Sequence, residues 1–351
     1  MLDLTRLYPG GVATRILLDL GFEVVKVEDT GAGDYLRDIS PLLFEMLNSG
    51  KKSVSINLKT REGREAFYRL AARSDVVVEG FRPGVAERLG VGYENLRRLN
   101  PRLVYCSING YGSRGPYAGL PGHDLNYVSV AGHLDPDLYP GEPRVPVVQV
   151  ADVGSALLCV IGILELLRRG TGGRVEVPMV EAALLFNTLN IAMKTEAGDA
   201  TLTGKYPFYN VYKCRDGYIT IGALEEKFWE NLCRALGRDD LRGKQLDPKA
   251  TRELAAELSR YTCREALEKL WAHDVPAAPA NKIEDLPRDP HLAARGYRPG
   301  RLLEAIVIDG TRPYTPGKAP RRGEHTREIL LELGYTEEEI EELKKKGAIH
   351  Y

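Results

Sequence analysis

Ionisable residues lie near both ends of one stretch of the chain, residues 122–154. The first end carries His123 and Asp124, the second carries Asp152, and each has the composition of a loop-to-helix junction. A histidine and a carboxylate delivered to one pocket could act as opposed proton donor and acceptor. A structural interpretation competes with this one, because both aspartates suit helix N-caps and His123 suits a buried core position.

The elements that must position these residues alternate between strand and helix. Hydrophobic patterning and turn residues predict strands near residues 2–4, 22–28, 53–58, 76–78, 103–108 and 174–177, with helices near 12–20, 61–72, 84–89, 93–99, 156–169 and 180–192. Repeated β-α-β units with short connections form a parallel sheet with right-handed crossovers. Ligands of such sheets bind beyond the carboxyl ends of the strands.

The loops that follow the predicted strands contain Lys59, Arg82 and Arg88. Arginine can bind phosphate through two hydrogen bonds and lysine acts as a point charge, so the three could hold a phosphorylated ligand. Taken one at a time, each is better explained as a solvated surface charge. The first β-α-β unit lacks the Gly-x-Gly-x-x-Gly turn of a dinucleotide site, which argues against NAD.

The second half of the chain predicts a smaller α+β domain. A break at residues 198–205 is followed by a hairpin over 206–221, by helices, and by a short strand at 306–308. The predicted domains are residues 1–197 and 198–310, with 311–351 as a separate C-terminal segment. Within that segment, 313–322 reads as an extended linker, and Thr336 with Glu339 forms a capping box at the last helix.

Composition excludes several classes of function. The formal net charge of −1 gives no basic field for nucleic acid, and the six histidines show no metal-ligand spacing. The five cysteines are scattered without a Cys-x-x-Cys pair, which argues against a disulfide scaffold and fits a reducing compartment. The apolar run 156–167 is too short to span a bilayer, and no signal peptide is visible. We therefore expect a cytoplasmic protein without metal, membrane or nucleic-acid partners.

A series of short motifs occurs in a fixed order along nearly the whole chain. They are Asp3–Leu7, Gly21–Glu28, Lys51–Val54, Glu79–Gly84, Arg88–Gly90, Gly110–Pro116, Gly122–Asp124, Ala151–Gly154, Asp289–Leu292 and Gly323–Thr326. In this order they resemble the family III CoA-transferase superfamily and, within it, the α-methylacyl-CoA racemase branch. The resemblance implies a Rossmann-like large domain completed by the C-terminal segment, a smaller domain, and an interlocked homodimer.

The resemblance also implies roles for site residues. In the transferases the aspartate matching Asp152 is a nucleophile, whereas in the racemases it is a general base paired with residues matching His123 and Glu225. Both partners are present here, which favours the racemase. The amide of Asp124 would then face the thioester oxygen. Coenzyme A contacts are implied at Leu7, Leu58, Lys59, Arg82 and Arg88, and substrate-pocket positions at Gln149 and Tyr209.

One position departs from the pattern of the family. Some relatives carry a basic residue after the second strand, where this chain has Asp29. Arg37 could substitute for it, or affinity for coenzyme A could depend on Arg82 and Arg88. Coenzyme A would be part of the substrate, and no further cofactor is expected.

Three functions remain open from the sequence. The first is racemisation or epimerisation of 2-methylacyl-CoA by 1,1-proton transfer through an enolate, an activity of lipid metabolism. The second is transfer of CoA between a thioester and a carboxylic acid through an aspartyl intermediate on Asp152. The third is binding of CoA without catalysis, which the presence of all three candidate catalytic groups disfavours.

Overall fold

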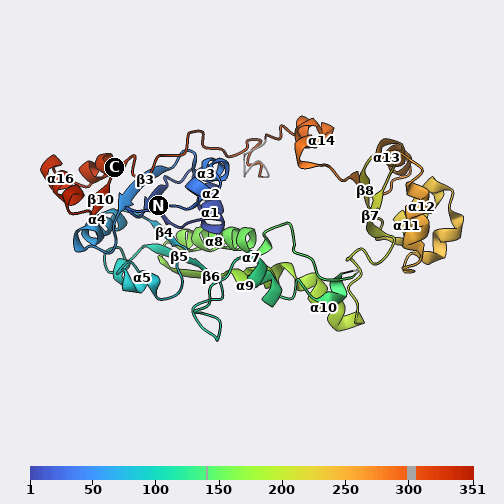
Figure 1. Ribbon diagram of the computed structural model, residues 1–351, viewed down its shortest axis with the longest axis horizontal. Helices are drawn as coiled ribbons and strands as arrows, with labels where there is room; N and C mark the ends of the chain where they lie inside the picture. Colours follow the sequence, from blue (N-terminus) through green and yellow to red (C-terminus); the bar gives the residue numbers. More distant parts are fainter. Residues whose placement is uncertain (140, 299–305) are drawn as a thin grey trace. The chain divides into compact units, whose positions relative to one another are not determined.

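The computed structural model spans residues 1–351 and describes all of them except 140 and 299–305 (Figure 1). The chain forms two compact units. The first unit comprises Met1–Ala131, Pro146–Phe186 and Gly300–Tyr351, and the second comprises Gly132–Val145 and Asn187–Pro299. The chain therefore leaves the first unit twice, and its C-terminal segment belongs to the unit in which the N-terminus lies.

A seven-stranded sheet forms the centre of the first unit, in the order β10-β3-β2-β1-β4-β5-β6. The six strands β1 to β6 are parallel, as the repeated β-α-β pattern predicts. Their bounds are β1 Leu2–Leu4, β2 Val25–Glu28, β3 Lys52–Ile56, β4 Val76–Glu79, β5 Val104–Asn109 and β6 Gly173–Pro178. The connecting helices are α1 Tyr8–Asp19, α2 Leu36–Ile39, α3 Pro41–Asn48, α4 Arg61–Ala72, α5 Val85–Arg88, α6 Tyr93–Leu96, α7 Asp124–Val130, α8 Val150–Arg169 and α9 Met179–Phe186.

Side chains of the strands alternate between two hydrophobic cores, one on each face of the sheet. Val77 and Tyr105 belong to the core beneath α4 and the C-terminal helices, together with Phe67 of α4. Val78 and Cys106 belong to the core on the opposite face, beneath α1, α3 and α8. Because both faces are covered, β4 is apolar at three successive positions and fully buried.

Charged side chains are buried beneath α1 in ion pairs. Lys26 lies 2.9 Å from Asp34, and Lys51 lies 3.0 Å from Asp3, with all four side chains at most 1% exposed. Lys51 also donates to the Thr14 hydroxyl of α1 at 2.7 Å. A buried charge is tolerated when it is paired and hydrogen bonded, so this network fixes the start of α1 relative to β1, β2 and β3.

The C-terminal segment completes the first unit. β10 (Ile349–His350) pairs antiparallel with β3 at the edge of the sheet, with Ile349 opposite Ile56. Two helices precede it, α15 (Thr326–Glu332) and α16 (Glu337–Lys345). The predicted capping box of α16 is confirmed, because the Thr336 hydroxyl accepts from the Glu339 N–H and Glu339 accepts from the Thr336 N–H.

The second unit is built on an antiparallel sheet of three strands in the order β7-β8-β9. The predicted hairpin is confirmed as β7 (Tyr209–Lys213) and β8 (Tyr218–Gly222), and β9 spans Ala277–Pro279. Trp229, which is buried, anchors its core. The helices are α10 Thr188–Ala197, η1 Pro136–Leu138, α11 Glu226–Leu236, η2 Asp239–Lys244, α12 Ala250–Leu258, α13 Cys263–Trp271, η3 Ile283–Arg288 and α14 Pro290–Ala294.

The structure corrects several predicted elements. The helix expected over 180–192 is two helices, α9 and α10, and α2 and α3 were not foreseen. The strand expected at Ile306–Ile308 is wrong, since Ile308 forms only an isolated bridge with Thr311. The apolar patterning of α8 suggested a buried helix, yet Ile161 on its outer face is 62% exposed in the single chain.

α8 is also longer than the apolar run from which it was predicted. Within the described part of the chain it is the one helix whose length and apolar composition would suffice to cross a membrane. The core helix of an α/β protein passes the same test, and the inner side of α8 contributes Ala156, Cys159 and Ile163 to the core against the sheet.

Candidate active site

A cavity of about 760 Å³ opens at the carboxyl ends of β1, β4 and β5. The N-terminal ends of α1, α7 and α8 also contribute to its wall. Its lining includes Arg6, Leu7, Tyr8, Phe81, Arg82, Asn109, His123, Tyr127, Asp152 and Met179. This is the edge of a parallel sheet at which ligands bind, as the order of the strands predicted.

Asp152 lies in the first turn of α8 and faces this cavity. Burial, and then the negative charge of Asp124, raise the pKa of Asp152 to about 7. A carboxyl group with a pKa close to the working pH can both donate and accept a proton. Asp152 is therefore suited to proton transfer, and its ionised form to attack on a carbonyl.

Asp124 connects the two ends of the stretch formed by residues 122–154. Its Oδ1 accepts from the Ala151 N–H at 2.7 Å and from the Asp152 N–H at 3.1 Å. Its side chain thus caps α8 from a distance of 27 residues along the sequence. The N-cap assignments made from the sequence were wrong, because His123 and Gln149 occupy the N-cap positions of α7 and α8.

His123 is exposed at the start of α7 and lines the same cavity as Asp152. Its backbone N–H donates to Oδ1 of Asn126 at 3.0 Å, which fixes the entry into the helix. Because the residue is exposed, the alternative of a buried core histidine is wrong. The structure thus places the imidazole of His123 and the carboxyl group of Asp152, whose pKa is raised, in the wall of the same cavity.

Tyr127 fixes the loops that enclose the cavity. Its ring is buried and packs edge-on against Tyr111, with 5.0 Å between the ring centres. A Cβ atom at Gly110 or Gly122 would lie 2.6 or 2.7 Å from the Tyr127 ring or its hydroxyl. Only glycine allows the backbone to pass this close, which explains the glycine before His123 in physical terms.

The loop between β1 and α1 forms another wall. Leu7 has φ 64°, a backbone conformation rare for a residue with a branched side chain. Buried groups hold it there: the Leu7 N–H donates to Asp34 at 3.1 Å, and Lys26 donates to the Thr5 carbonyl at 3.0 Å. Strained residues that the surrounding structure holds in place cluster at functional sites.

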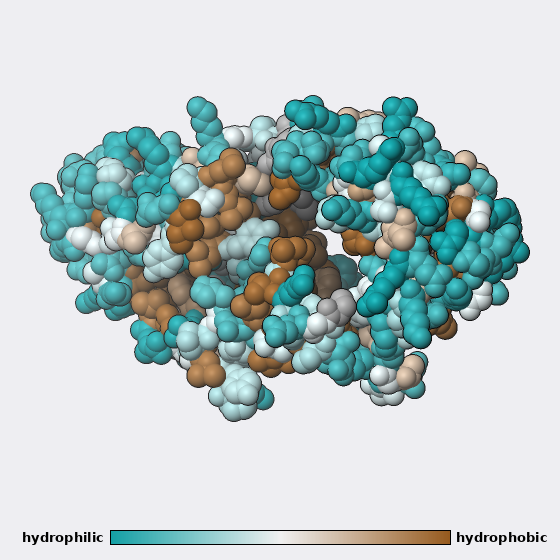
Figure 2. Space-filling model, turned by 45° about the vertical axis from the view of Figure 1, so that its right-hand side comes forward, coloured by the Kyte–Doolittle hydropathy of each residue, from teal (hydrophilic) through white to brown (hydrophobic). Residues whose placement is uncertain are grey.

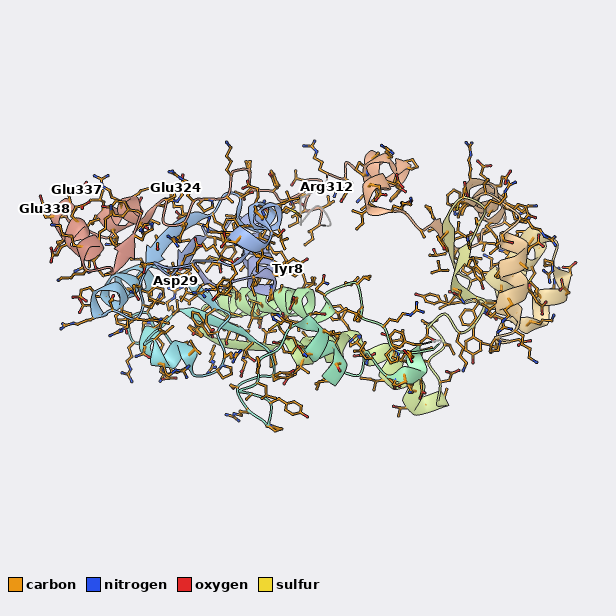
Figure 3. All side chains as sticks on the ribbon, in the orientation of Figure 1. Tyr8, Asp29, Arg312, Glu324, Glu337 and Glu338 are labelled. Atoms are coloured by element: carbon orange, nitrogen blue, oxygen red, sulfur yellow. The ribbon has the colours of Figure 1, made fainter. Side chains whose placement is uncertain are left out.

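Tyr8 follows Leu7 as the first residue of α1 and was not identified from the sequence. It lines the cavity, and Figure 3 labels it on the first unit. Burial, and then the charge of Asp152, raise the pKa of its phenol. Tyr8 is therefore a neutral hydrogen-bond donor within electrostatic reach of Asp152. In the sequence, Tyr8 is only a tyrosine at the start of a helix after the first strand, and this pattern is too weak to mark it as a site residue.

Glu79, the last residue of β4, supports the loop that carries Arg82. Its carboxylate accepts from the Phe81 N–H at 2.6 Å, and the residue is 4% exposed. Burial raises the pKa of Glu79 to about 7. Phe81 and Arg82, which follow it, both line the cavity.

A second cavity, of about 490 Å³, lies at the ends of β1, β2 and β3. Leu58 and Lys59, where the family resemblance implied coenzyme A contacts, line this cavity. Arg6 and Phe81 line both cavities, so the two adjoin. Both cavities lie at the carboxyl edge of the sheet and share these two residues in their walls.

Asp29, also labelled in Figure 3, occupies the wall of this second cavity. It forms an ion pair with Arg6 and accepts from the Gly31 N–H at 2.7 Å. Arg37 does not replace the missing basic residue here. Its guanidinium donates twice to Glu28, at 2.9 and 2.7 Å, and lies over the Phe44 ring. Arg6, which the sequence analysis did not single out, is the cation placed between the cavities.

Comparison with known proteins identifies the family. The family model described as CoA-transferase family III matches residues 1–326. The chain belongs to CoA-transferase family III. It is 33% identical to alpha-methylacyl-CoA racemase from Homo sapiens, an alignment that covers 99% of this chain and 96% of that protein. It is 29% identical to formyl-CoA:oxalate CoA-transferase from Escherichia coli O157:H7, with 99% of this chain and 98% of that protein covered.

Solved structures agree with the fold. The crystal structure of Rv3272 from Mycobacterium tuberculosis matches with a TM-score of 0.81 at 30% identity, covering 93% of this chain and 96% of that one. A CAIB/BAIF family protein from Brucella suis matches with a TM-score of 0.79 at 27% identity, covering 95% and 97%. The predicted fold class is confirmed.

The other site positions that the resemblance to family III implied are spread over several elements of the structure. Arg88 is exposed on α5 and lines neither of the two cavities as far as the described residues show. Gln149 is exposed at the start of α8. Tyr209 and Glu225 belong to the second unit, in β7 and at the N-cap of α11, and both are exposed. His123, Asp152, Leu7 and Arg82 share the first cavity.

Proposed function

We propose that this family III protein is a racemase or epimerase of 2-methylacyl-CoA thioesters. The observation that carries the proposal is the pairing of His123 with Asp152, whose pKa is about 7, around one cavity. A 1,1-proton transfer needs two groups that exchange roles, one protonated and one not. An Asp152 pKa near neutrality allows both states at physiological pH.

In the proposed reaction, His123 removes the α-proton from one face of the substrate and Asp152 returns a proton to the other. Starting from the opposite enantiomer, the roles reverse. The family resemblance assigns to Glu225 the orientation of His123, and to the Asp124 N–H a hydrogen bond to the enolate oxygen. One such donor contributes about 3–4 kcal/mol to stabilising a developing oxyanion.

Coenzyme A would bind along the two adjoining cavities. Lys59 and Arg82 are cations in the walls of the second and first cavity, where they can pair with phosphates. Leu7 and Leu58 supply apolar wall, and Gln149 and Tyr209 are proposed to meet the acyl group. We also propose that the protein is a cytoplasmic homodimer, in which exposed apolar residues of α8 are covered.

CoA transfer is the second candidate function. This chain is 33% identical to a racemase and 29% identical to a CoA-transferase, in both cases over almost its whole length. These two similarities favour the two reactions almost equally. In this reaction the ionised Asp152 would attack the thioester carbonyl and release the CoA thiolate. The CoA thiolate would then attack the Asp152 carbonyl of the resulting anhydride, which releases the donor carboxylate and leaves an aspartyl-CoA thioester. The acceptor carboxylate would attack that thioester to form a second anhydride, and the CoA thiolate released there would attack its acyl carbonyl, which gives the new thioester and frees Asp152. His123 would have no essential part.

The test is deuterium incorporation at Cα of each 2-methylacyl-CoA enantiomer in heavy water, without an added carboxylic acid. Exchange with loss of optical purity from both enantiomers supports the racemase. His123→Ala should reduce this rate by about 10²–10⁴-fold, the usual contribution of a general acid or base. Absence of exchange, with CoA transfer once a carboxylic acid is supplied, would refute the racemase.

Two variants control this experiment. Asp152→Asn should abolish racemisation and transfer alike, so it confirms the site without separating the reactions. Glu225→Gln should slow racemisation and leave CoA transfer unchanged if Glu225 acts through His123. Turnover of neither kind, with stabilisation by CoA thioester in a thermal shift, would favour a binding protein.

A further inference from the structure

Two cysteines from distant parts of the sequence meet in the core of the first unit. The Sγ atoms of Cys106 and Cys159 lie 3.0 Å apart, and both residues are fully buried. Cys106 is in the middle of β5, and Cys159 is on the side of α8 that packs against the sheet. Because 53 residues separate them in the sequence, no spacing motif reveals the pair.

We propose that Cys106 and Cys159 form a disulfide bond as the chain folds. A disulfide has an S–S bond of about 2.05 Å, so the two sulfur atoms need to approach by only about 1 Å. The bond would join β5 to α8 through side chains that already meet. In the reaction the two thiols lose two protons and two electrons to a disulfide oxidant, such as oxidised glutathione, which is reduced to two thiols.

The folded environment determines when this bond can form. Burial, and then the neighbouring Cys106, raise the pKa of the Cys159 thiol well above its ordinary value. The thiolate is the species that attacks a disulfide, so a thiol buried among apolar side chains is unreactive. Oxidation therefore precedes the closing of α8 over β5, and the finished bond is shielded from reductants.

A metal site accounts for the two cysteines less well than a cross-link does. Metal binding would need further ligands, and the described part of the chain contains no cluster of three or more His, Cys, Asp or Glu residues. The scattered cysteines fit a reducing compartment, in which disulfides are rare, but intracellular proteins of hyperthermophiles are an exception. Glutamine occurs only at Gln149 and Gln245 while charged residues make up 28% of the chain, a leaning found in thermophiles. Intracellular disulfides are common in hyperthermophiles.

The bond would tie together two walls of the active site. β5 ends at Asn109, which lines the first cavity, and α8 carries Asp152 in its first turn. Neither cysteine lines that cavity. We therefore expect the bond to change thermal stability and the lifetime of activity at high temperature, and to leave the chemistry at Asp152 unaltered.

The experiment starts from the full chain unfolded under reducing conditions. One sample is refolded with oxidised and reduced glutathione, the other with reduced glutathione alone. Free thiols are then alkylated in denaturant, and peptides are mapped by mass spectrometry. We expect a cross-linked peptide pair containing Cys106 and Cys159 in the oxidised sample, with Cys233 alkylated. Thermal unfolding of that sample should shift upward by roughly 10 °C.

Variants make the test specific. In Cys106→Ala and Cys159→Ala the stability difference between oxidised and reduced samples should disappear, whereas it should persist in Cys233→Ala, a change at another buried cysteine. Synthesis of the chain in a cell-free mixture containing oxidised glutathione repeats the mapping without a refolding step. Alkylation of both Cys106 and Cys159 in protein that has folded in the presence of oxidised glutathione would overturn the proposal.

Discussion

The proton affinity of Asp152 depends on two features of its surroundings, and each can be changed separately. Partial burial disfavours the ionised carboxylate, and the nearby charge of Asp124 adds to this effect. Tyr8 lines the same cavity, and the charge of Asp152 acts on its phenol. A phenol that donated to the charged form of Asp152 would act in the opposite direction.

Replacing Tyr8 by phenylalanine tests the last of these effects. We expect the phenol to donate to ionised Asp152 when the site works, so loss of the hydroxyl should raise the pKa of Asp152. The acidic limb of the pH–activity profile should therefore move to higher pH by about one unit. The control is Tyr93→Phe, which changes a ring packed against Tyr105 on the other face of the sheet. An unchanged profile would show that Tyr8 does not contact the reacting groups.

Asp124→Asn should have the opposite effect. The substitution removes the neighbouring negative charge and leaves an amide oxygen to accept from the Ala151 and Asp152 N–H groups. The pKa of Asp152 should fall below about 7, and the acidic limb should move to lower pH. Asp124→Ala also loses the cap of α8, which costs about 1 kcal/mol. Thermal unfolding separates the two variants, and equal stability would contradict the capping role.

At the scale of elements, the site depends on how α1, α7 and α8 begin. Asp124 joins α7 to α8, Tyr127 holds two glycine-containing loops, and Asp34 with Lys26 holds the loop before α1. None of these contacts is between neighbours in the sequence. The starts of α1 and α8 are fixed by side chains from other elements, and Tyr127 of α7 holds the loops beside its own helix. Damage to these contacts should therefore reach the site.

Gly10→Ala tests the contact between α1 and Thr5, which follows the end of β1. A Cβ at Gly10 would lie 2.2 Å from Cβ of Thr5, whose hydroxyl donates to buried Asp3 at 2.6 Å. Overpacking of this kind costs roughly 1–3 kcal/mol. We expect lower thermal stability together with lower activity, because Leu7 and Tyr8 lie between the two residues. Gly119→Ala is the control, since its Cβ would meet no atom within 4 Å. Equal stability of the two variants would contradict this contact.

For the whole molecule, the main feature is apolar surface on a single copy of the chain. Figure 2 shows brown, apolar side chains at the surface, and the exposed residues of α8 include Leu157, Ile161 and Leu164. Their spacing places them on one side of the helix, opposite the side that packs on the sheet. A contiguous apolar face of this kind marks an interaction site. A second copy is the occupant that the proposed homodimer supplies.

Ile161→Lys should therefore weaken self-association. A lysine in the centre of an apolar interface must be desolvated without a partner, which costs several kcal/mol. Sedimentation velocity should show a shift from dimer to monomer. Ile283→Lys is the matched control, because Ile283 is 85% exposed and lies in the second unit. Dimers of unchanged affinity in both variants would show that this face of α8 is not the interface.

The sequence by itself determined the parallel strands β1 to β6, the hairpin of β7 and β8, and the family. These follow from local patterns, because hydrophobic periodicity, turn residues and motif order are written along the chain. It also singled out His123 and Asp152 as candidates, which stand next to or near recognisable glycines.

Only the tertiary structure decided which side chains meet. Asp124 caps α8, Arg37 pairs with Glu28, and Cys106 touches Cys159, although the residues of each pair are not neighbours in the sequence. Tyr8 and Asp152 likewise line one cavity. Their geometry is set by how helices pack on the sheet, and no local pattern encodes it. The raised pKa of Asp152 is likewise decided only by the tertiary structure, since its burial and its neighbouring charge exist only after folding.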